Sequence, residues 1–389
     1  MKKTKPGLLL KVLTAIVFGV LCGYFFPAWA VRVFATFNGI FSQFLGFSIP
    51  LIILGLVAPG IADLGKSAGK LLLITVALAY ASTLFSGFFT YFSCDAFFPE
   101  ILANAQINMN VDNPETALLS PYFTIDMPPV FGVTTALILA FVAGIGLTAV
   151  KGETLKSALT EFRSVIELLI IKIIIPFLPF YIFGIFLNMS HSGAAIRLVE
   201  VFGKVVIVIF VLHILLLLIL FSLAGAATRR NPLAMLRTML PAYATALGTS
   251  SSAATIPVTL AQVKKLGVKA DIADFCVPLC ATIHLSGSIM KIVSMSLAIC
   301  IITGLPHDLA LYVEFVFMIG ILMVAAPGVP GGAIMAAVGA LQSMLGFSEA
   351  SLGLMIALYI ALDSFGTACN VTGDGALTAI VNKIGSRSY

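Results

Sequence analysis

The chain has 389 residues, of which 60% are hydrophobic and only 10% charged. Soluble domains carry about a quarter charged residues, so this composition excludes a water-soluble globular protein and favours one polytopic membrane domain in contact with lipid. The net charge of +5 comes from basic residues scattered among short loops, which argues against a nucleic-acid partner.

Six apolar blocks in the first part of the chain are each long enough to cross a bilayer as a helix, which takes about 20 residues. We expect them at residues 8–26, 37–57, 71–92, 130–150, 166–187 and 201–224. Between the third and fourth blocks lies a polar segment, residues 94–129, with five acidic residues and neither Lys nor Arg.

The distribution of Lys and Arg predicts the orientation of these blocks. Basic residues concentrate at the N-terminal end and in alternate loops, whereas the 94–129 segment is acidic. Because positive charge favours the cytoplasmic side, we expect both termini in the cytoplasm and the acidic segment outside. The sequence therefore predicts a multi-pass protein of the cell (inner) membrane.

The C-terminal half contains a first polar interruption, between Arg237 and Lys264. This stretch should leave and regain the cytoplasmic side, yet it is too short for two full spans, which need about 40 residues. In its middle lies a run of small, mostly hydroxyl-bearing residues, 248–255. We expect a re-entrant hairpin with a non-helical tip, where a helix N-terminus suits a carboxylate. A Ser/Thr-rich helix contact is the alternative.

A second interruption, residues 325–332, contains two prolines and three glycines. These residues do not fit inside an ordinary helix, and the apolar stretches beside them, 311–324 and 333–345, are each short for a span. We expect a second hairpin, entered from outside, with a plain extracellular loop as the alternative. Two interrupted short segments in corresponding positions are typical of a transporter site.

The last apolar block, residues 352–380, carries a polar stripe. Asp363, Thr367, Asn370 and Asp374 follow one another at spacings of four, three and four, which places them on one helical face. Carboxylates inside a span are costly and usually mark ion or substrate paths. We therefore expect a functional site on this face.

The seventh block, residues 272–302, adds titratable groups at the same depth. His284, Ser288 and Lys291 are spaced four and three and should share a face, with the two aspartates of the last block as partners. A satisfied core histidine is the alternative for His284. Ser288 and His284 on one helix make a poor nucleophile–base pair, so we do not expect an enzyme.

Four motifs in this half resemble, in order and spacing, the dicarboxylate/amino acid:cation symporter family, which includes the glutamate transporters. They are residues 251–259, 278–283, 328–331 and 370–374. The last, Asn-Val-Thr-Gly-Asp, is very specific in this context. The resemblance covers the C-terminal half strongly, whereas the first six spans match mainly in number and orientation.

The resemblance implies an all-α integral membrane fold of eight transmembrane helices plus two re-entrant hairpins, assembled as a homotrimer. Residues 1–230 should be mostly trimerisation scaffold, with the third and sixth spans joining the transport domain. Residues 231–389 should be the transport core, which slides against the scaffold as an elevator.

The resemblance also implies a small-molecule site with Na+ or H+ as coupling ion and no other cofactor. The expected substrate-binding residues are Ser250, Ser251, Ser252, Ser288, Val329, Pro330, Gly331, Gly332, Asp363, Thr367 and Asn370. The expected coupling-ion residues are Cys280, His284, Ser286, Lys291, Asn370, Asp374, Tyr80 and Thr83.

Two departures from the family pattern bear on substrate and coupling. Positions where relatives of acidic specificity carry an arginine are Ser250, Ser364 and Gly366 here, so no fixed guanidinium can clamp a side-chain carboxylate. We therefore expect a small neutral amino acid rather than an acidic one, unless Lys291 replaces the arginine. Ser286 stands where the family has a sodium-binding aspartate.

We hypothesise that Lys291 or His284 substitutes for a cation, so that transport uses protons or fewer sodium ions. Two alternatives stay open. One is a proton-coupled or uncoupled carboxylate transporter or exchanger, and the other is an anion-conducting channel of the same fold.

Overall fold

The computed structural model describes residues 8–66, 70–107, 118–150, 153–193, 195–326 and 330–385, and these residues contain helices and connections but no strand. The all-α prediction is therefore confirmed for the described part of the chain. In order, the helices are α1 (Leu8–Gly23), α2 (Ala28–Lys66), α3 (Lys70–Ile107), α4 (Val133–Ala149), α5 (Thr154–Leu169), the π-helical turn η1 (Ile170–Ile174), α6 (Ile175–His191), α7 (Ala195–Thr228), α8 (Pro232–Thr249), α9 (Ser252–Lys265), α10 (Ala270–Ile283), α11 (Ser286–Thr303), α12 (Leu309–Ala325), α13 (Gly332–Leu345), α14 (Glu349–Ala361) and α15 (Asp363–Gly385).

Several of these helices are long and apolar enough to cross a membrane. Five qualify among the described residues, or six when α14 and α15 are taken as one span bent by 59°. The helices α1, α4, α12 and α13 are apolar but shorter. These lengths support a multi-pass membrane protein without fixing the number of spans.

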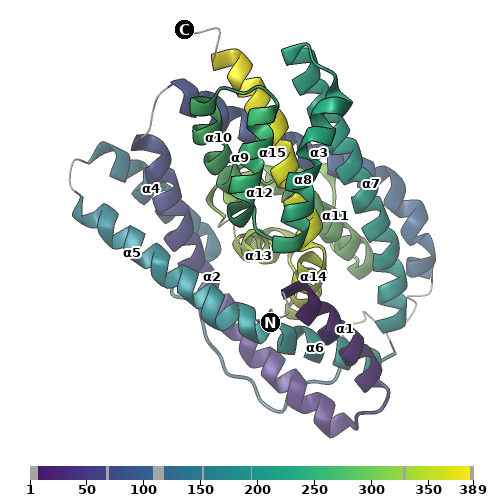
Figure 1. Ribbon diagram of the computed structural model, residues 1–389. Coiled ribbons are helices and arrows are strands. Elements are labelled where there is room, and N and C mark those ends of the chain that lie inside the picture. Colours follow the sequence, from purple (N-terminus) through teal and green to yellow (C-terminus); the bar gives the residue numbers. More distant parts are fainter. Residues whose placement is uncertain are drawn as a thin grey trace, which may run out of the picture.

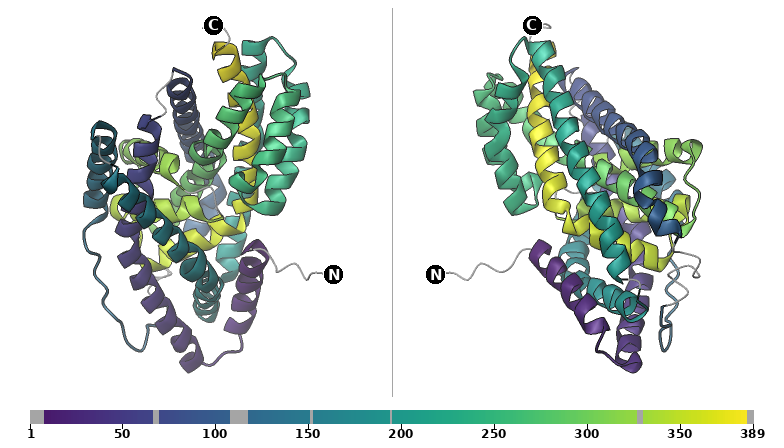
Figure 2. Two further views of the ribbon diagram at one scale, coloured as in Figure 1. Left: turned by 60° about the vertical axis from the view of Figure 1, so that its left-hand side comes forward. Right: turned by 90° about the vertical axis from the view of Figure 1, so that its right-hand side faces the viewer.

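The helices form two groups that differ in their neighbours. In the first group, α1 packs against α6, while α2 packs against α4, α5 and α6 (Figure 1). In the second group, α15 lies among α7, α8, α9, α10 and α11, and it runs from the middle of the molecule towards one end (Figures 1 and 2). Although α3 comes early in the chain, it packs against α11 and α12.

Several predicted blocks differ from the helices in their ends or are broken inside. The third helix continues to Ile107 and so includes the first part of the acidic segment, and the fifth block lies inside a longer helical run, 154–191. The last block is bent at Leu362. The seventh block is interrupted at His284 and Leu285, whose backbone angles are not helical, although Ala270–Thr303 is together long and apolar enough for one span.

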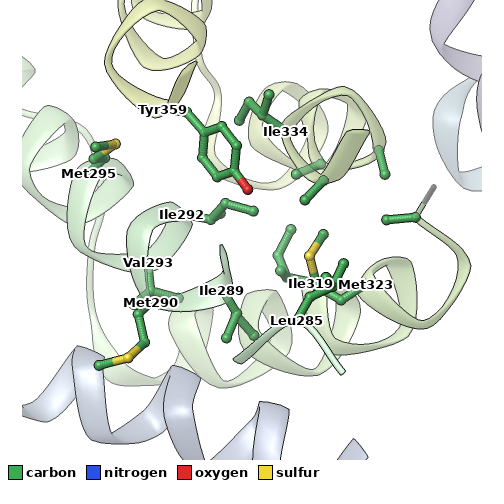
Figure 3. Close-up of a cluster of buried hydrophobic side chains, with 14 of the residues drawn as sticks. Leu285, Ile289, Met290, Ile292, Val293, Met295, Ile319, Met323, Ile334 and Tyr359 are labelled. Atoms are coloured by element: carbon green, nitrogen blue, oxygen red, sulfur yellow. The ribbon is translucent and has the colours of Figure 1, made fainter. Parts of the chain in front are cut away.

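The helix α11 lies at the centre of the second group. Its residues from Ser286 to Ile302 are all buried, as expected for a helix surrounded by protein on every side. Figure 3 shows apolar side chains of α11, α12, α13 and α14 meeting around Ile292 and Tyr359. This packing places the start of α11 in an apolar interior.

Candidate functional site

The junction between α8 and α9 is a two-residue break. Ser250 adopts a left-handed conformation with φ 50°, and the Ser251 side chain caps α9 by accepting the Ala254 backbone N–H at 3.2 Å. The rest of the predicted non-helical tip, 248–255, is helical, so that prediction is too broad. The Ser250 hydroxyl lies 2.7 Å from the Ser364 hydroxyl of α15.

The junction between α12 and α13 reaches the same part of α15. Gly331 has φ 75°, which favours glycine, and its backbone N–H donates to Asp363 Oδ2 at 2.8 Å. Pro330 and Gly332 flank it, whereas Val329 lies outside the described residues. Both helix-pair junctions are therefore hydrogen-bonded to consecutive residues at the start of α15.

Lys291 of α11 is fully buried and pairs with Asp363. Its Nζ lies 3.1 Å from Asp363 Oδ1, 3.4 Å from the Leu362 carbonyl oxygen and 3.6 Å from the centre of the Tyr359 ring. A Cβ on Gly366 would lie 2.3 Å from Lys291 Cε, so the glycine makes room for the lysine stem. The prediction that an aspartate of the last span would partner Lys291 is confirmed.

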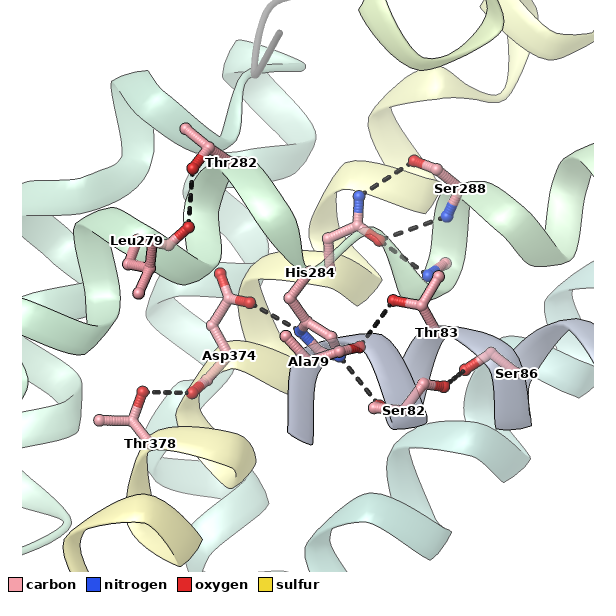
Figure 4. A network of polar contacts seen from close by, with 12 residues as sticks. Ala79, Ser82, Thr83, Ser86, Leu279, Thr282, His284, Ser288, Asp374 and Thr378 are labelled. Carbon is pink, nitrogen blue, oxygen red and sulfur yellow. Dashed lines mark hydrogen bonds and ion pairs between the residues drawn. The ribbon is translucent and has the colours of Figure 1, made fainter. Parts of the chain in front are cut away.

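His284 connects three elements at the interruption between α10 and α11. Its Nδ1 lies 2.8 Å from Asp374 Oδ1, and its Nε2 lies 2.9 Å from the Ser82 hydroxyl of α3 (Figure 4). The predicted aspartate partner is again confirmed. Because His284 lies in the interruption, between the two helices, it is not on one helical face with Ser288 and Lys291, and that part of the prediction is wrong.

Asn370 holds the first turn of α11. Its Oδ1 accepts the backbone N–H groups of Gly287 and Ser288 at 2.7 and 3.2 Å, and its Nδ2 donates to the Ser288 hydroxyl at 3.0 Å. His213 of α7 contacts the Gly287 carbonyl oxygen at 3.1 Å. Asn370 thereby satisfies backbone N–H groups that have no helical acceptor at the start of α11.

Five buried side-chain oxygens have no hydrogen-bond partner among the described residues: Asn38 Oδ1, the Tyr359 hydroxyl, Ser286 Oγ, Thr372 Oγ1 and Asp374 Oδ2. Buried polar groups are nearly always satisfied, so such oxygens call for an explanation. Ser286 Oγ lies beside His284, because a Cβ on Gly373 would be close to both residues. Carboxylate and hydroxyl oxygens are the kinds of ligand that suit Na+.

The remaining residues of the predicted site make contacts within their own helix, lie against a neighbouring helix or are simply buried. Thr83 donates to the Ala79 carbonyl oxygen of its own helix, and Tyr80 lies against Gly320 of α12. Cys280 is buried, and its carbonyl oxygen accepts the His284 N–H. Thr367 is also buried, on the same helix as Asp363. The structure thus pairs Lys291, which we expected among the coupling-ion residues, with Asp363, which we expected among the substrate-binding residues.

Sequence reasoning missed the roles of several residues. Ser82 was not selected, although Ser82, Ser86 and Thr90 recur every four residues and form a buried hydroxyl row on α3. Tyr359 lies four residues before Asp363, a spacing that points to the same site. His213 gave no local signal.

A multi-span helical fold with interrupted helices and buried ion pairs defines a membrane transporter. The chain belongs to the sodium:dicarboxylate symporter family, whose model matches residues 8–384. It is similar to the serine/threonine transporter SstT of Acinetobacter baumannii strain AYE, with 26% identity over 396 residues that span 97% of each chain. The proteins of the same name from strains AB307-0294 and AB0057 give the same values.

The family places the chain among cation-coupled transporters of amino acids and dicarboxylates, and not among enzymes. Sodium is the coupling ion that the family's description names.

Proposed function

We propose that the protein is a symporter for a small neutral amino acid. The observation that carries this proposal is the composition of the junction site, where Ser250 and Ser364 contact each other and Gly366 has no side chain. An acidic side chain would find no guanidinium at these three positions. The name of the similar serine/threonine transporters supports the same substrate class.

The two ends of an amino acid find complementary groups at the start of α9 and α15. The first turn of α9 has backbone N–H groups without intrahelical acceptors, and such a helix N-terminus suits a carboxylate. Asp363 supplies the acceptor for the ammonium group, and the Thr367 hydroxyl comes from the same helix face. Ser250, Ser251, Ser252 and Ser288 provide small polar walls.

We propose an elevator-type movement between the two helix groups. The scaffold comprises α1, α2, α4, α5 and α6, and the transport domain comprises α3 and α7–α15, with α8–α9 and α12–α13 as re-entrant hairpins. Cavities of about 330 and 450 Å³ lie between α2 and the start of α14, near Gln43 and Glu349. An incompletely packed boundary suits two bodies that slide.

The proposed assembly is a homotrimer in the cell (inner) membrane with both termini in the cytoplasm. The exposed apolar side chains of α4 and α5, such as Ile138, Val142 and Leu168, suit burial against lipid or another protomer. The charge distribution of the loops supports the orientation. Mass measurement of the purified protein in detergent tests the trimer.

We propose that coupling uses fewer cations than the family's motif provides. Asp363 is paired with Lys291 and one oxygen of Asp374 with His284, so two charges that could hold sodium already have partners. Ser286 Oγ and Asp374 Oδ2 remain for one cation. Sodium or the proton fills this role.

Uptake into proteoliposomes tests substrate and coupling together. We expect saturable uptake of radiolabelled serine or alanine that responds to a sodium or a pH gradient. Saturable glutamate uptake without serine or alanine uptake would refute the substrate class. Uptake that runs only on sodium, ignores a pH gradient and survives Lys291→Met would refute the replacement of a cation, and voltage-driven flux without saturation would indicate a channel.

A further inference from the structure

The Lys291–Asp363 pair is complete in itself. The ammonium group faces Asp363 Oδ1, the Leu362 carbonyl oxygen and the Tyr359 ring, while Asp363 Oδ2 accepts the Gly331 N–H. An incoming ammonium group therefore competes with Lys291 for the carboxylate. The Gly331 N–H and the lysine together occupy both carboxylate oxygens.

The pair lies in apolar surroundings. Lys291 is fully buried, and its ammonium group lies 3.6 Å from the centre of the Tyr359 ring, which belongs with Ile292 and Ile334 to an apolar cluster (Figure 3). In such a medium a charge separated from its partner is costly, so the charges that a ligand displaces must be compensated by the ligand itself.

Charge balance decides which ligands meet this condition. A cation that takes Asp363 leaves Lys291 without a counter-charge, and an anion that takes Lys291 leaves Asp363 without one. A zwitterion compensates both, because its ammonium group replaces Lys291 on Asp363 and its carboxylate pairs with the released lysine. The site and its ligand are then neutral before and after binding.

We propose that Lys291 binds the substrate carboxylate after the substrate ammonium group displaces it from Asp363. Lys291 is thereby a specificity-determining residue that selects zwitterions over anions and cations of equal size. The long lysine stem allows the movement, and the missing side chain at Gly366 leaves it room. This inference rests on the proposed function and adds Lys291 to the first turn of α9 as a second partner of the substrate carboxylate, together with a selection rule.

Three compounds of nearly equal size and different charge test the rule: L-serine, L-glycerate and L-serine methyl ester. Their affinities for the purified full-length protein are measured by calorimetry. We expect serine to bind about 100-fold more tightly than either other compound, since each of these leaves one buried charge unpaired. Glycerate or the ester binding as tightly as serine would overturn the proposal without any variant.

Two single variants reverse the preference. Lys291→Met leaves Asp363 without the lysine and should favour the ester over serine. Asp363→Asn leaves Lys291 without the carboxylate and should favour glycerate. The double variant carries neither charge and serves as the matched control, which should lose both preferences.

A purely structural role of the pair would weaken all three compounds alike, and that result overturns the partner exchange. The partner exchange is also overturned if the Lys291→Met variant binds serine with the affinity of the wild-type protein. By contrast, wild-type protein that binds no neutral amino acid at all refutes the proposed substrate class.

Discussion

Gly366→Ala isolates the geometry of the Lys291–Asp363 pair, because it changes neither charge. The new Cβ would lie 2.3 Å from Lys291 Cε and 2.7 Å from Nζ, and both distances are too short for real contacts. These atoms are the far end of a flexible side chain, so the backbone can stay in place. The ammonium group has to move away from Asp363 instead.

The magnitude follows from this displacement. Removing one partner of a buried ion pair costs about 3–5 kcal/mol, but here both charges remain close to each other. We therefore expect destabilisation typical of overpacking, about 1–3 kcal/mol, in the free energy of unfolding. The thermal unfolding midpoint should fall by a few degrees.

Gly203→Ala is the matched control, because Gly203 lies in helix α7 with no atom near its Cβ position. It should change stability by less than about 1 kcal/mol, in the stabilising direction. Thermal unfolding in detergent and serine uptake are measured for both variants. If Gly366→Ala has the same thermal unfolding midpoint as Gly203→Ala and transports serine at the wild-type rate, Lys291 is not held where the structure places it.

Three further predictions concern the other contacts of the site. The double variant His284→Asn with Ser286→Asp adds cation ligands and should therefore be stabilised by sodium, by about 2.7 kcal/mol when the sodium concentration is 100 times its dissociation constant. Equal thermal unfolding midpoints of this variant with and without sodium would contradict the prediction. Ser250→Ala and Ser364→Ala should each cost about 1 kcal/mol, and their double variant no more than either alone, as a double-mutant cycle of unfolding measures. Asn370→Ala should cost about 2 kcal/mol or more by leaving the start of α11 uncapped, and a loss below that of Ser250→Ala would show that the cap is dispensable.

The polar stripe of α15 could be predicted from the sequence because a regular helix fixes its spacing. An unpaired charge at membrane depth is costly, so Lys291 and His284 need counter-charges nearby. The two aspartates of the last block were the available ones. Both inferences used only local periodicity and charge, and the structure confirms both pairs.

The interruption at His284 could not be predicted, because its cause lies in other elements. Asn370 of α15 accepts backbone N–H groups that have no helical acceptor, His213 of α7 contacts the Gly287 carbonyl oxygen, and Ser82 of α3 orients the imidazole. Residues 272–302 by themselves contain nothing that ends a helix at this point. Tertiary hydrogen bonds overrode the local helix preference of the segment.

The position of Asp363 supports the reversal expected for Lys291→Met. The carboxylate begins α15 and accepts the first N–H of the turn before α13, so two helix N-termini favour its negative charge. This stabilisation comes from the backbone and persists when the lysine is replaced. Asp363 therefore keeps its backbone partner and remains an acceptor for a cationic ligand in the variant, which is why losing Lys291 should change the charge preference of the site rather than abolish binding.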